Sequence, residues 1–230
     1  MIDDKIWIAS FDLGKINFAF TIEELDIKCL KSIKNIPKDK RYNPNGTCTP
    51  IFEELLCNLY KTGKVILIKN INLTKNCSGD KKYTEQDVFH NMIDCLDEYK
   101  KDYWDKVSYF VIEKQMKINQ SACRLSMVCM SYFMFNYGRF RQVIEFNSYY
   151  KTTILGAKRD TKKLKNGKVK FVSTTKNERK KWAVEKAVHI LSEREDFEII
   201  QDIMSNGKKD DKCDVLCQLQ AFKYLEFIDK

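Results

Sequence analysis

The sequence predicts a mixed α/β fold, on the strength of three observations. Two β-rich runs near the start of the chain, residues 5–11 and 16–22, are joined by a very short connection, which predicts a hairpin. Between residues 64 and 146, short apolar runs alternate with segments of helical periodicity. The last part of the chain has a helical pattern with an apolar stripe formed by Val215, Leu216, Leu219 and Phe222. This order of elements is typical of a sheet that carries helices.

The remaining elements follow from local patterns taken in order. Residues 26–33 are interpreted as a third strand, and residues 36–50 are polar and rich in turn formers. Thr84 is a suitable helix cap, with Asp87 at the third following position. Further strands are expected at 64–71, 107–113 and 142–146, and helices at 51–60, from 84 onward, at 121–137, at 177–192 and at 210–227.

The chain is long enough for one substantial core. It has 230 residues, of which 43% are apolar, and only 8 Gly and 3 Pro, so no low-complexity linker divides it. We therefore expect residues 1–230 to form a single domain. Insertions are expected at about 34–63 and 71–83, and an exposed basic loop at about 156–176.

The charge balance favours a polyanionic partner. There are 41 Lys and Arg against 32 Asp and Glu, a formal charge of +9, which would speed the encounter with nucleic acid, although a basic surface can also serve solubility alone. The most basic stretch, residues 151–181, also carries aromatic side chains. The residues expected to contact DNA are Lys114, Lys158, Arg159, Lys162, Lys163, Lys180 and Lys181.

The cysteines indicate a reducing compartment. Their number, nine, is odd, and the N-terminus has no secretory pattern. A run of about 18 apolar residues is absent, so a soluble intracellular protein without a membrane partner is expected. A zinc module is disfavoured, since there is no C-x-x-C and neither His90 nor His189 is near a cysteine pair along the chain.

Four carboxylates stand where a fold could gather them. Asp12 ends the first strand, Glu113 ends the apolar run Y-F-V-I-E, and Asp211 and Asp214 share a face at the start of the last helix. Asp210 competes with Asp211 for the same role. Each acid also has an ordinary structural explanation, since Asp before Gly forms turns and acids complement a helix N-terminus.

Oxygen ligands of this kind suit hard divalent cations such as Mg²⁺ or Mn²⁺. Two such ions about 4 Å apart can activate a water molecule and stabilise the leaving oxygen of a phosphodiester. The acids therefore indicate a metal-dependent nuclease, and no small-molecule cofactor is expected.

Three motifs together resemble the RuvC-like Holliday junction resolvases of the RNase H-like superfamily, most closely their poxvirus-type branch. They are W-I-A-S-F-D-L-G-K-I-N-F-A-F in the hairpin, V-I-E-K-Q at residues 111–115 and K-K-D-D-K-C-D-V-L-C-Q at residues 208–218. The resemblance implies an RNase H-like fold, with a central mixed five-stranded sheet flanked by helices. It assigns Asp12, Glu113, Asp211 and Asp214 as catalytic metal ligands holding two ions.

The resemblance further implies a homodimer that makes paired symmetric nicks in four-way DNA junctions during recombination and repair. Residues 121–137 resemble the dimer-forming helix, and the branch suggests a virus that replicates in the host cytoplasm. Alternatives are a nuclease for other branched DNA or RNA/DNA hybrids, and a non-catalytic DNA-binding protein. The actin-like ATPases, which also open with D-x-G, need glycine-rich phosphate loops that this chain lacks.

Overall fold

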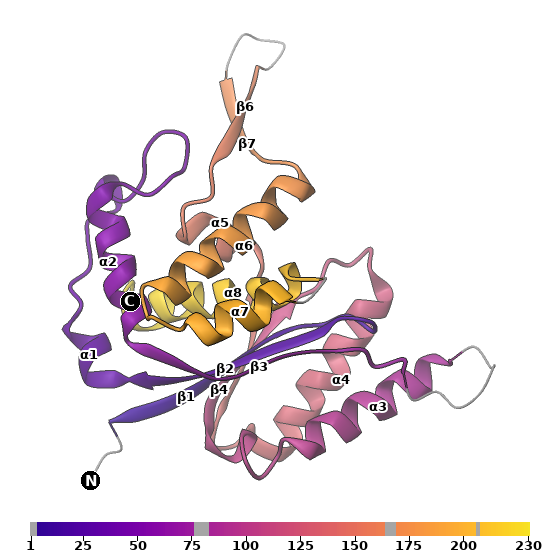
Figure 1. The fold of residues 1–230 in the computed structure, drawn as a ribbon. Helices are drawn as coiled ribbons and strands as arrows, with labels where there is room; N and C mark the ends of the chain where they lie inside the picture. The colour runs from indigo at the N-terminus through magenta and orange to yellow at the C-terminus, as the bar shows by residue number, and fades with distance from the viewer. Residues whose placement is uncertain (1–3, 76–82, 164–168, 206–207) are drawn as a thin grey trace. The chain divides into compact units, whose positions relative to one another are not determined.

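The computed structural model describes residues 4–75, 83–163, 169–205 and 208–230 (Figure 1). These residues form two compact units. The first, here called the sheet unit, comprises Met1–Asp26 and Lys64–Ser148, and the second, the helical unit, comprises Ile27–Gly63 and Tyr149–Lys230. Parts of the predicted insertion at 71–83 and of the predicted basic loop lie outside the described residues. The single-domain organisation stays a prediction.

The sheet unit contains the mixed five-stranded sheet that the sequence predicts. The strands lie in the order β3-β2-β1-β4-β5. β1 pairs antiparallel with β2 and parallel with β4, and β4 pairs parallel with β5. Their bounds are Lys5–Asp12 for β1, Phe18–Asp26 for β2, Gly63–Ile71 for β3, Val107–Lys114 for β4 and Gln142–Asn147 for β5.

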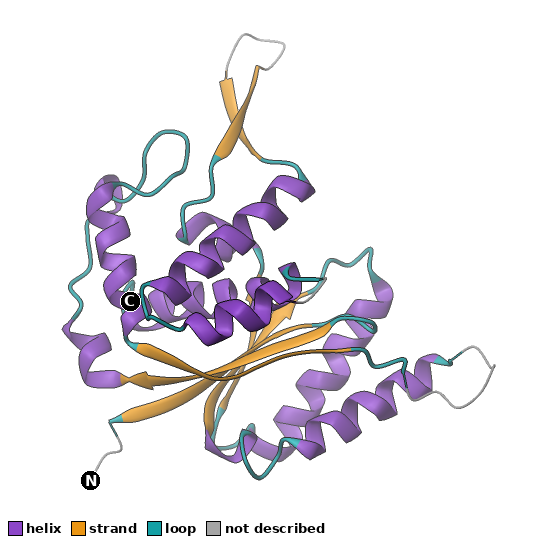
Figure 2. Ribbon diagram, viewed as in Figure 1, coloured by secondary structure: helices purple, strands orange, loops and turns teal. Residues whose placement is uncertain are grey.

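Helices α3 (Glu85–Glu98) and α4 (Gln120–Tyr137) lie side by side against the sheet unit's strands (Figures 1 and 2). The predicted start of α3 is confirmed, because Thr84 accepts a hydrogen bond from the Asp87 amide while the Asp87 carboxylate accepts from the Thr84 amide. A short 3-10 helix, Trp104–Lys106, leads into β4. The apolar stripe of α3, which includes Val88, Met92 and Leu96, is buried in the core cluster with residues of the sheet.

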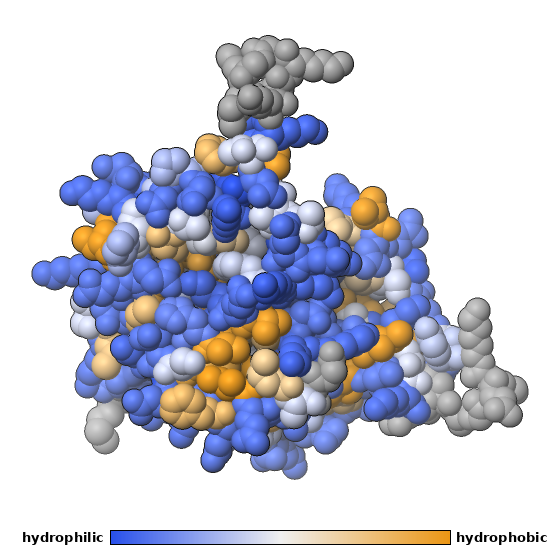
Figure 3. Space-filling view, turned by 45° about the horizontal axis from the view of Figure 1, so that its top comes forward, coloured by the Kyte–Doolittle hydropathy of each residue, from blue (hydrophilic) through white to orange (hydrophobic). Residues whose placement is uncertain are grey.

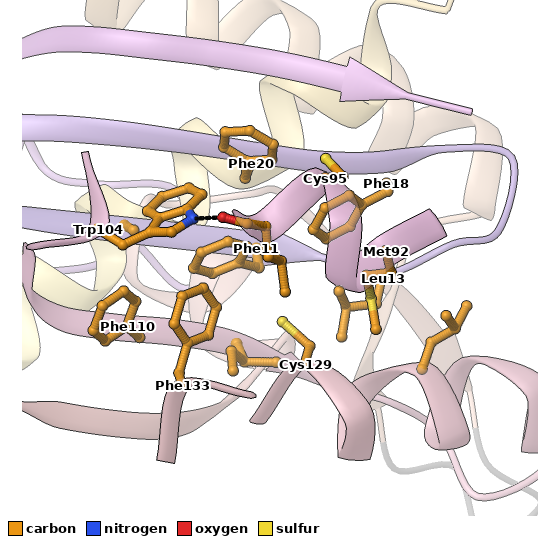
Figure 4. Close-up of a cluster of buried hydrophobic side chains, with 14 of the residues drawn as sticks. Phe11, Leu13, Phe18, Phe20, Met92, Cys95, Trp104, Phe110, Cys129 and Phe133 are labelled. Carbon is orange, nitrogen blue, oxygen red and sulfur yellow. Dashed lines mark hydrogen bonds between the residues drawn. The ribbon is translucent and has the colours of Figure 1, made fainter. Parts of the chain in front are cut away.

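An aromatic cluster fills the space between the sheet and these helices (Figure 4). Phe11 of β1 packs against Trp104 and Phe133, with ring centroids 5.6 and 5.1 Å apart. The indole of Trp104 is fully buried and donates a hydrogen bond of 2.7 Å to the Leu96 carbonyl. Buried aromatic rings of this size dominate core energetics, so the cluster holds β1 and β4 in a defined register.

The helical unit is built around α8 (Asp210–Phe227), which contacts α2 (Pro50–Lys61), α5 (Tyr149–Ile154) and α6 (Lys176–Ser192). The described side chains of α8 from Lys212 to Tyr224 are buried on every face except at Asp214. A helix that is buried on most faces forms the centre of a packed unit, and in α8 the buried set includes the polar residues Gln218, Gln220 and Lys223. The smaller helices are α1 (Ile27–Ser32), the 3-10 helix Lys38–Lys40 and α7 (Phe197–Ser205).

Two predictions about local structure are wrong. Within residues 26–33, Asp26 is the last residue of β2, and Ile27–Ser32 form helix α1. Ile27 and Leu30 are three residues apart, as on one face of a helix, and Leu30 is buried. The predicted basic loop at 156–176 contains a hairpin of β6 (Arg159–Lys163) and β7 (Val169–Ser173). In β7, Val169 and Phe171 are separated by Lys170, and Val, Phe and Val residues favour a strand.

A largely buried ion pair in the helical unit joins Arg41 to Asp229 near the C-terminus. Arg41 donates to the Asp229 carboxylate over 2.7 Å and to the Ile36 carbonyl, and its guanidinium also lies over the Tyr224 ring. Burial would raise the pKa of Asp229, but the hydrogen bonds from Arg41 and Asn35 hold it below its ordinary value of 3.8. The pair therefore stabilises the folded state at neutral pH and loses that effect as pH falls through the lowered pKa.

Replacing Arg41 with methionine is expected to reduce the free energy of unfolding at pH 7 by about 2 kcal/mol, the size of a lost hydrogen bond to a charged group. The difference from the wild type should shrink as pH falls below the ordinary pKa of Asp229 and through its lowered pKa, because the carboxyl group of the folded wild type then becomes protonated and the ion pair is lost. Urea unfolding at several pH values measures it. Arg124→Met, which breaks the half-exposed pair of Arg124 with Glu85, is the control and should change little. A pH-independent difference would contradict the assignment.

The face of the molecule drawn in Figure 3 is mostly hydrophilic, with smaller hydrophobic areas between the polar side chains. Within the described residues, no helix combines the length and apolar character needed to cross a membrane.

Candidate active site

Asp12 and Glu113 lie next to each other at one edge of the sheet. β1 and β4 are adjacent and parallel, and the last residues paired between them are Phe11 and Ile112. Asp12 and Glu113 each follow by one residue, so their side chains leave the same face of the sheet, about 4.8 Å apart in the strand-to-strand direction. Phe11 and Ile112 point into the aromatic cluster on the opposite face. The sheet therefore brings together the two acids that the sequence predicts at strand ends.

The connection after Asp12 is shaped by glycine. A Cβ atom at Gly14 would lie 2.9 Å from the Asn17 carbonyl oxygen, closer than side chains allow. Leu13 is buried, and the Lys15 carbonyl accepts a hydrogen bond from the Leu73 amide. This close turn fixes the end of β1 and with it the position of the Asp12 carboxylate.

Three aspartates begin α8 in the helical unit. Asp211 and Asp214 are three residues apart, and Asp210 and Asp214 four apart, so all three acids lie near one face of the helix. Each is partly buried. Lys209 at the N-cap makes no side-chain cap, and the acids complement the positive end of the helix dipole.

Two lysines neutralise these aspartates. Lys151, itself buried, forms an ion pair of 3.0 Å with Asp214, and Lys180 donates a hydrogen bond to Asp210. The hydrogen bond to Asp210 and the charges of the three acids raise the pKa of Lys180. Partial burial would raise the pKa of Asp210, yet Lys180 lowers it. Asp210 therefore carries negative charge at neutral pH, and a cation must compete with Lys180 for Asp210 and with Lys151 for Asp214.

The ion pair of Lys151 with Asp214 was not predicted from the sequence. Lys151 lies in α5, which the sequence does not predict, and it is distant from α8 along the chain. Lys180 was expected to contact DNA, and it lies beside the aspartates instead of standing alone on the surface. The acid that each lysine of the predicted basic stretch contacts depends on the packing of α5, α6 and α8, and the sequence alone does not show that packing.

The other predicted DNA-contacting residues fall into three settings. Lys114 ion-pairs with Glu145 over 2.9 Å and points to the face of the sheet opposite Glu113. Lys181 is exposed on α6, with only a long 3.7 Å pair to Glu185. Lys158, Arg159, Lys162 and Lys163 belong to the hairpin and the residue before it, and the side chain of Lys163 lies outside the described part of the structure.

A small basic hollow lies where the hairpin joins α5 and α6. Arg179 donates to the Thr174 carbonyl, and the Arg159 amide donates to the Asn45 carbonyl, so both arginines are held in place. The hairpin itself projects away from these helices (Figure 1). Cations and hydroxyls that suit a phosphate line the hollow: Lys158, Arg159, Arg179, Thr152, Thr153 and Ser173.

The two groups of acids fit a hard divalent cation by their chemistry, since every predicted ligand is a carboxylate. Asp12 and Glu113 lie together in the sheet unit, and Asp210, Asp211 and Asp214 lie together in the helical unit. Convergence of the two groups on common ions stays a prediction.

The fold is similar to that of RuvC. The RuvC structure of Thermus thermophilus matches with a TM-score of 0.52 at 7% identity, over 96% of this chain and 98% of that one. The RNase H-like fold predicted from the sequence is thereby confirmed. Fowlpox virus resolvase, solved with substrate Holliday junction DNA, is similar with a TM-score of 0.49 at 17% identity, over 96% of this chain and 97% of that one. A likeness of this degree does not distinguish branches, so the poxvirus-type assignment stays a prediction.

The chain belongs to the same family as uncharacterized protein 170L of Invertebrate iridescent virus 6. The two are 34% identical over 248 residues, which cover 100% of this chain and 93% of the relative. Uncharacterized protein 97L of Invertebrate iridescent virus 3 is 28% identical, over 94% of this chain and 98% of that protein. No family model matches the sequence. The relatives are viral, in agreement with the viral origin suggested by the sequence.

Proposed function

We propose that this protein is a metal-dependent endonuclease that resolves four-way DNA junctions by paired symmetric nicks. The observation that carries the proposal is the pair of acids, Asp12 and Glu113, side by side at the ends of β1 and β4 in a RuvC-like fold. The aspartates at the start of α8 supply the remaining ligands. Asp12, Glu113, Asp211 and Asp214 are the proposed catalytic set, with Asp210 held by Lys180.

The proposed chemistry is hydrolysis of a phosphodiester. Two Mg²⁺ or Mn²⁺ ions, when bound, would activate the attacking water and stabilise the leaving 3′-oxygen. The chain's own part is to orient oxygen ligands on rigid elements: a sheet edge for Asp12 and Glu113, and the first turn of a helix for Asp211 and Asp214. Lys151 and Lys180 would balance the charge of Asp214 and Asp210 in the absence of ions, and once released by bound ions they would be available to contact the DNA phosphate.

We propose that DNA binds along the basic surface of the helical unit. The hollow at the base of the β6–β7 hairpin offers cations and hydroxyls for a backbone phosphate. Lys162 and Lys170 pair across the hairpin and extend the positive surface along it, and the partly exposed ring of Phe171 lies on the opposite face of the hairpin. Such contacts are independent of sequence and suit a substrate recognised by its shape.

Replacing Lys158 with alanine is therefore expected to weaken junction binding by several-fold and to lower the slope of log affinity against log salt by about one unit, as for the loss of one phosphate contact. Fluorescence anisotropy at several salt concentrations gives the slope. Lys5→Ala, which removes an exposed cation paired with Glu24 at the start of β1, is the matched control. Equal slopes in the wild type and the Lys158 variant would remove this residue from the interface.

Paired nicks require two active sites in one particle, and α4 offers a surface for a second copy. Its outward face carries exposed apolar side chains at helical spacing, Met127, Met134 and Phe135, of which Phe135 is 92% exposed. We propose that the homodimer forms through this face, and that the sedimentation mass of the purified protein is twice that of one chain.

The direct test is incubation of the purified protein with a mobile four-way junction, a plain duplex and an RNA/DNA hybrid, each with Mg²⁺ or EDTA. The proposal expects Mg²⁺-dependent paired nicks in the junction alone. Cleavage of the hybrid in preference to the junction would redirect the substrate assignment to RNA in hybrids. No cleavage of any substrate, by a protein that binds the junction, would leave a DNA-binding protein without nuclease activity.

A further inference from the structure

A second group of possible metal ligands lies inside the helical unit, and its chemistry differs from that of the carboxylates. Glu53, Cys57 and His189 each offer a ligand atom, and these atoms lie within 4.8 Å of one another. Glu53 and Cys57 are four residues apart on α2 and so share a face, while His189 comes from the last turns of α6. The group links two helices whose residues are far apart in the sequence.

The spacing of the three ligand atoms matches a tetrahedral zinc site. Zinc binds sulfur at about 2.3 Å and imidazole nitrogen or carboxylate oxygen at about 2.05 Å, so tetrahedral angles put S and N about 3.6 Å apart and N and O about 3.3 Å apart. The Cys57 sulfur lies 3.7 Å from His189 Nε2, and His189 Nε2 lies 3.2 Å from a Glu53 oxygen. These two separations are within about 0.1 Å of the tetrahedral values, and the Cys57 sulfur lies within 4.8 Å of a Glu53 oxygen.

The surroundings support ligands of this kind. The His189 ring packs edge-on against the buried Tyr60 ring, with centroids 6.1 Å apart, which limits rotation of the imidazole. Lys186 donates to Glu53 Oε1 over 2.8 Å, so it orients the carboxylate and balances part of its charge. The same oxygen, Oε1, lies near His189 and accepts from Lys186, so a metal bound through Oε1 would share it with Lys186, or a turn of the carboxylate would present Oε2.

The ligand set selects a soft or borderline cation. Thiolate and imidazole suit Zn²⁺, whereas Mg²⁺ takes oxygen ligands. Burial and the charges of Glu193 and Glu53 raise the pKa of Cys57 to about 11, so the thiol is protonated in the metal-free protein at neutral pH. On binding, an S–Zn bond replaces the S–H bond and the proton passes to the buffer. The three protein ligands leave one position for water.

We propose that Glu53, Cys57 and His189 form a zinc site that clamps α2 to α6, separate from the nuclease carboxylates in ligands and in metal. The site lies at the contact of two helices that support α8, so zinc would stabilise the helical unit. The proposal does not depend on nuclease activity. It changes the conclusion drawn from the sequence alone, which disfavoured zinc because no histidine lies near a cysteine pair along the chain.

Cobalt substitution tests the site without DNA or Mg²⁺. The full chain is stripped with EDTA, dialysed under reducing conditions and titrated with Co²⁺. A bound thiolate gives a sulfur-to-cobalt charge-transfer band in the near ultraviolet, which cobalt on the nuclease carboxylates cannot give. We expect this band in the wild type at about one equivalent per chain. Zn²⁺ should remove the band by displacing cobalt.

The variants assign the signal to these residues. Cys57→Ser should abolish the band, and His189→Asn should weaken or shift it, while the matched controls Cys29→Ser and His90→Asn should keep it. Zn²⁺ should raise the melting temperature of the wild type and of both controls by on the order of 5 °C, with no rise in Cys57→Ser. A wild type that gives no band, or a Cys57→Ser protein that keeps it, would overturn the proposal and leave the three residues as a hydrogen-bonded cluster.

Discussion

Replacing Asp12 with asparagine is expected to reduce junction cleavage by at least about a thousand-fold, because loss of a metal ligand removes several kcal/mol of transition-state stabilisation. Junction binding should stay within about threefold of the wild type, since binding depends on phosphate contacts elsewhere. Asparagine has the size of aspartate and sits at a partly buried strand end, so the fold should tolerate it. Single-turnover cleavage and anisotropy measure the two quantities.

The control for this substitution is Asp102→Asn, which changes the same group at an exposed position before the 3-10 helix. It should cleave and bind like the wild type. Two results would count against the role given to Asp12: cleavage that survives in the Asp12 variant, or a loss of binding that parallels the loss of cleavage. The second would indicate that the carboxylate supports the fold or the DNA surface.

The parts of the fold that the sequence predicts are those with local signals. The capping pair Thr84 and Asp87 predicts the start of α3 because both hydrogen bonds are made within one turn. β4 is predicted because an apolar run of strand length has no helical period. Helix α1 was interpreted as a strand, because in six residues one helical turn and an alternating pattern look alike. The β6–β7 hairpin was not predicted from the sequence, because its many lysines are typical of an exposed loop and the apolar residues Val169 and Phe171 are few.

The same distinction applies to the sites. Asp12 and Glu113 are readable from the sequence because each follows an apolar strand, and parallel pairing of those strands then puts them side by side. The partners Lys151 and Lys180 depend on how α5 and α6 pack on α8, and no local pattern encodes that. Cys57 and His189 are 132 residues apart, and each looks like an ordinary helix residue until α2 meets α6.

Asp214 offers the strongest test of whether the two groups of acids act on common ions. The Asp214→Asn variant alone is expected to lose about a thousand-fold in cleavage, as for Asp12→Asn. If both acids serve the same ions, the double variant should be no worse than either single variant by more than about tenfold, because residues that act as a unit are not additive. Single-turnover rates over a range of Mg²⁺ and Mn²⁺ concentrations measure this.

The Asp214→Asn experiment needs a parallel stability measurement and a matched control. Asp214 pairs with the buried Lys151, so its replacement leaves an unpaired ammonium, and unfolding must be measured in parallel to separate lost stability from lost catalysis. Asp202→Asn is the matched control, because Asp202 likewise accepts from a lysine, Lys212, at 2.6 Å but is itself half exposed. If the losses in the double variant multiplied to the product of the single losses in a protein of normal stability, Asp12 and Asp214 would act independently. The start of α8 would then bind something other than the ions held by the sheet.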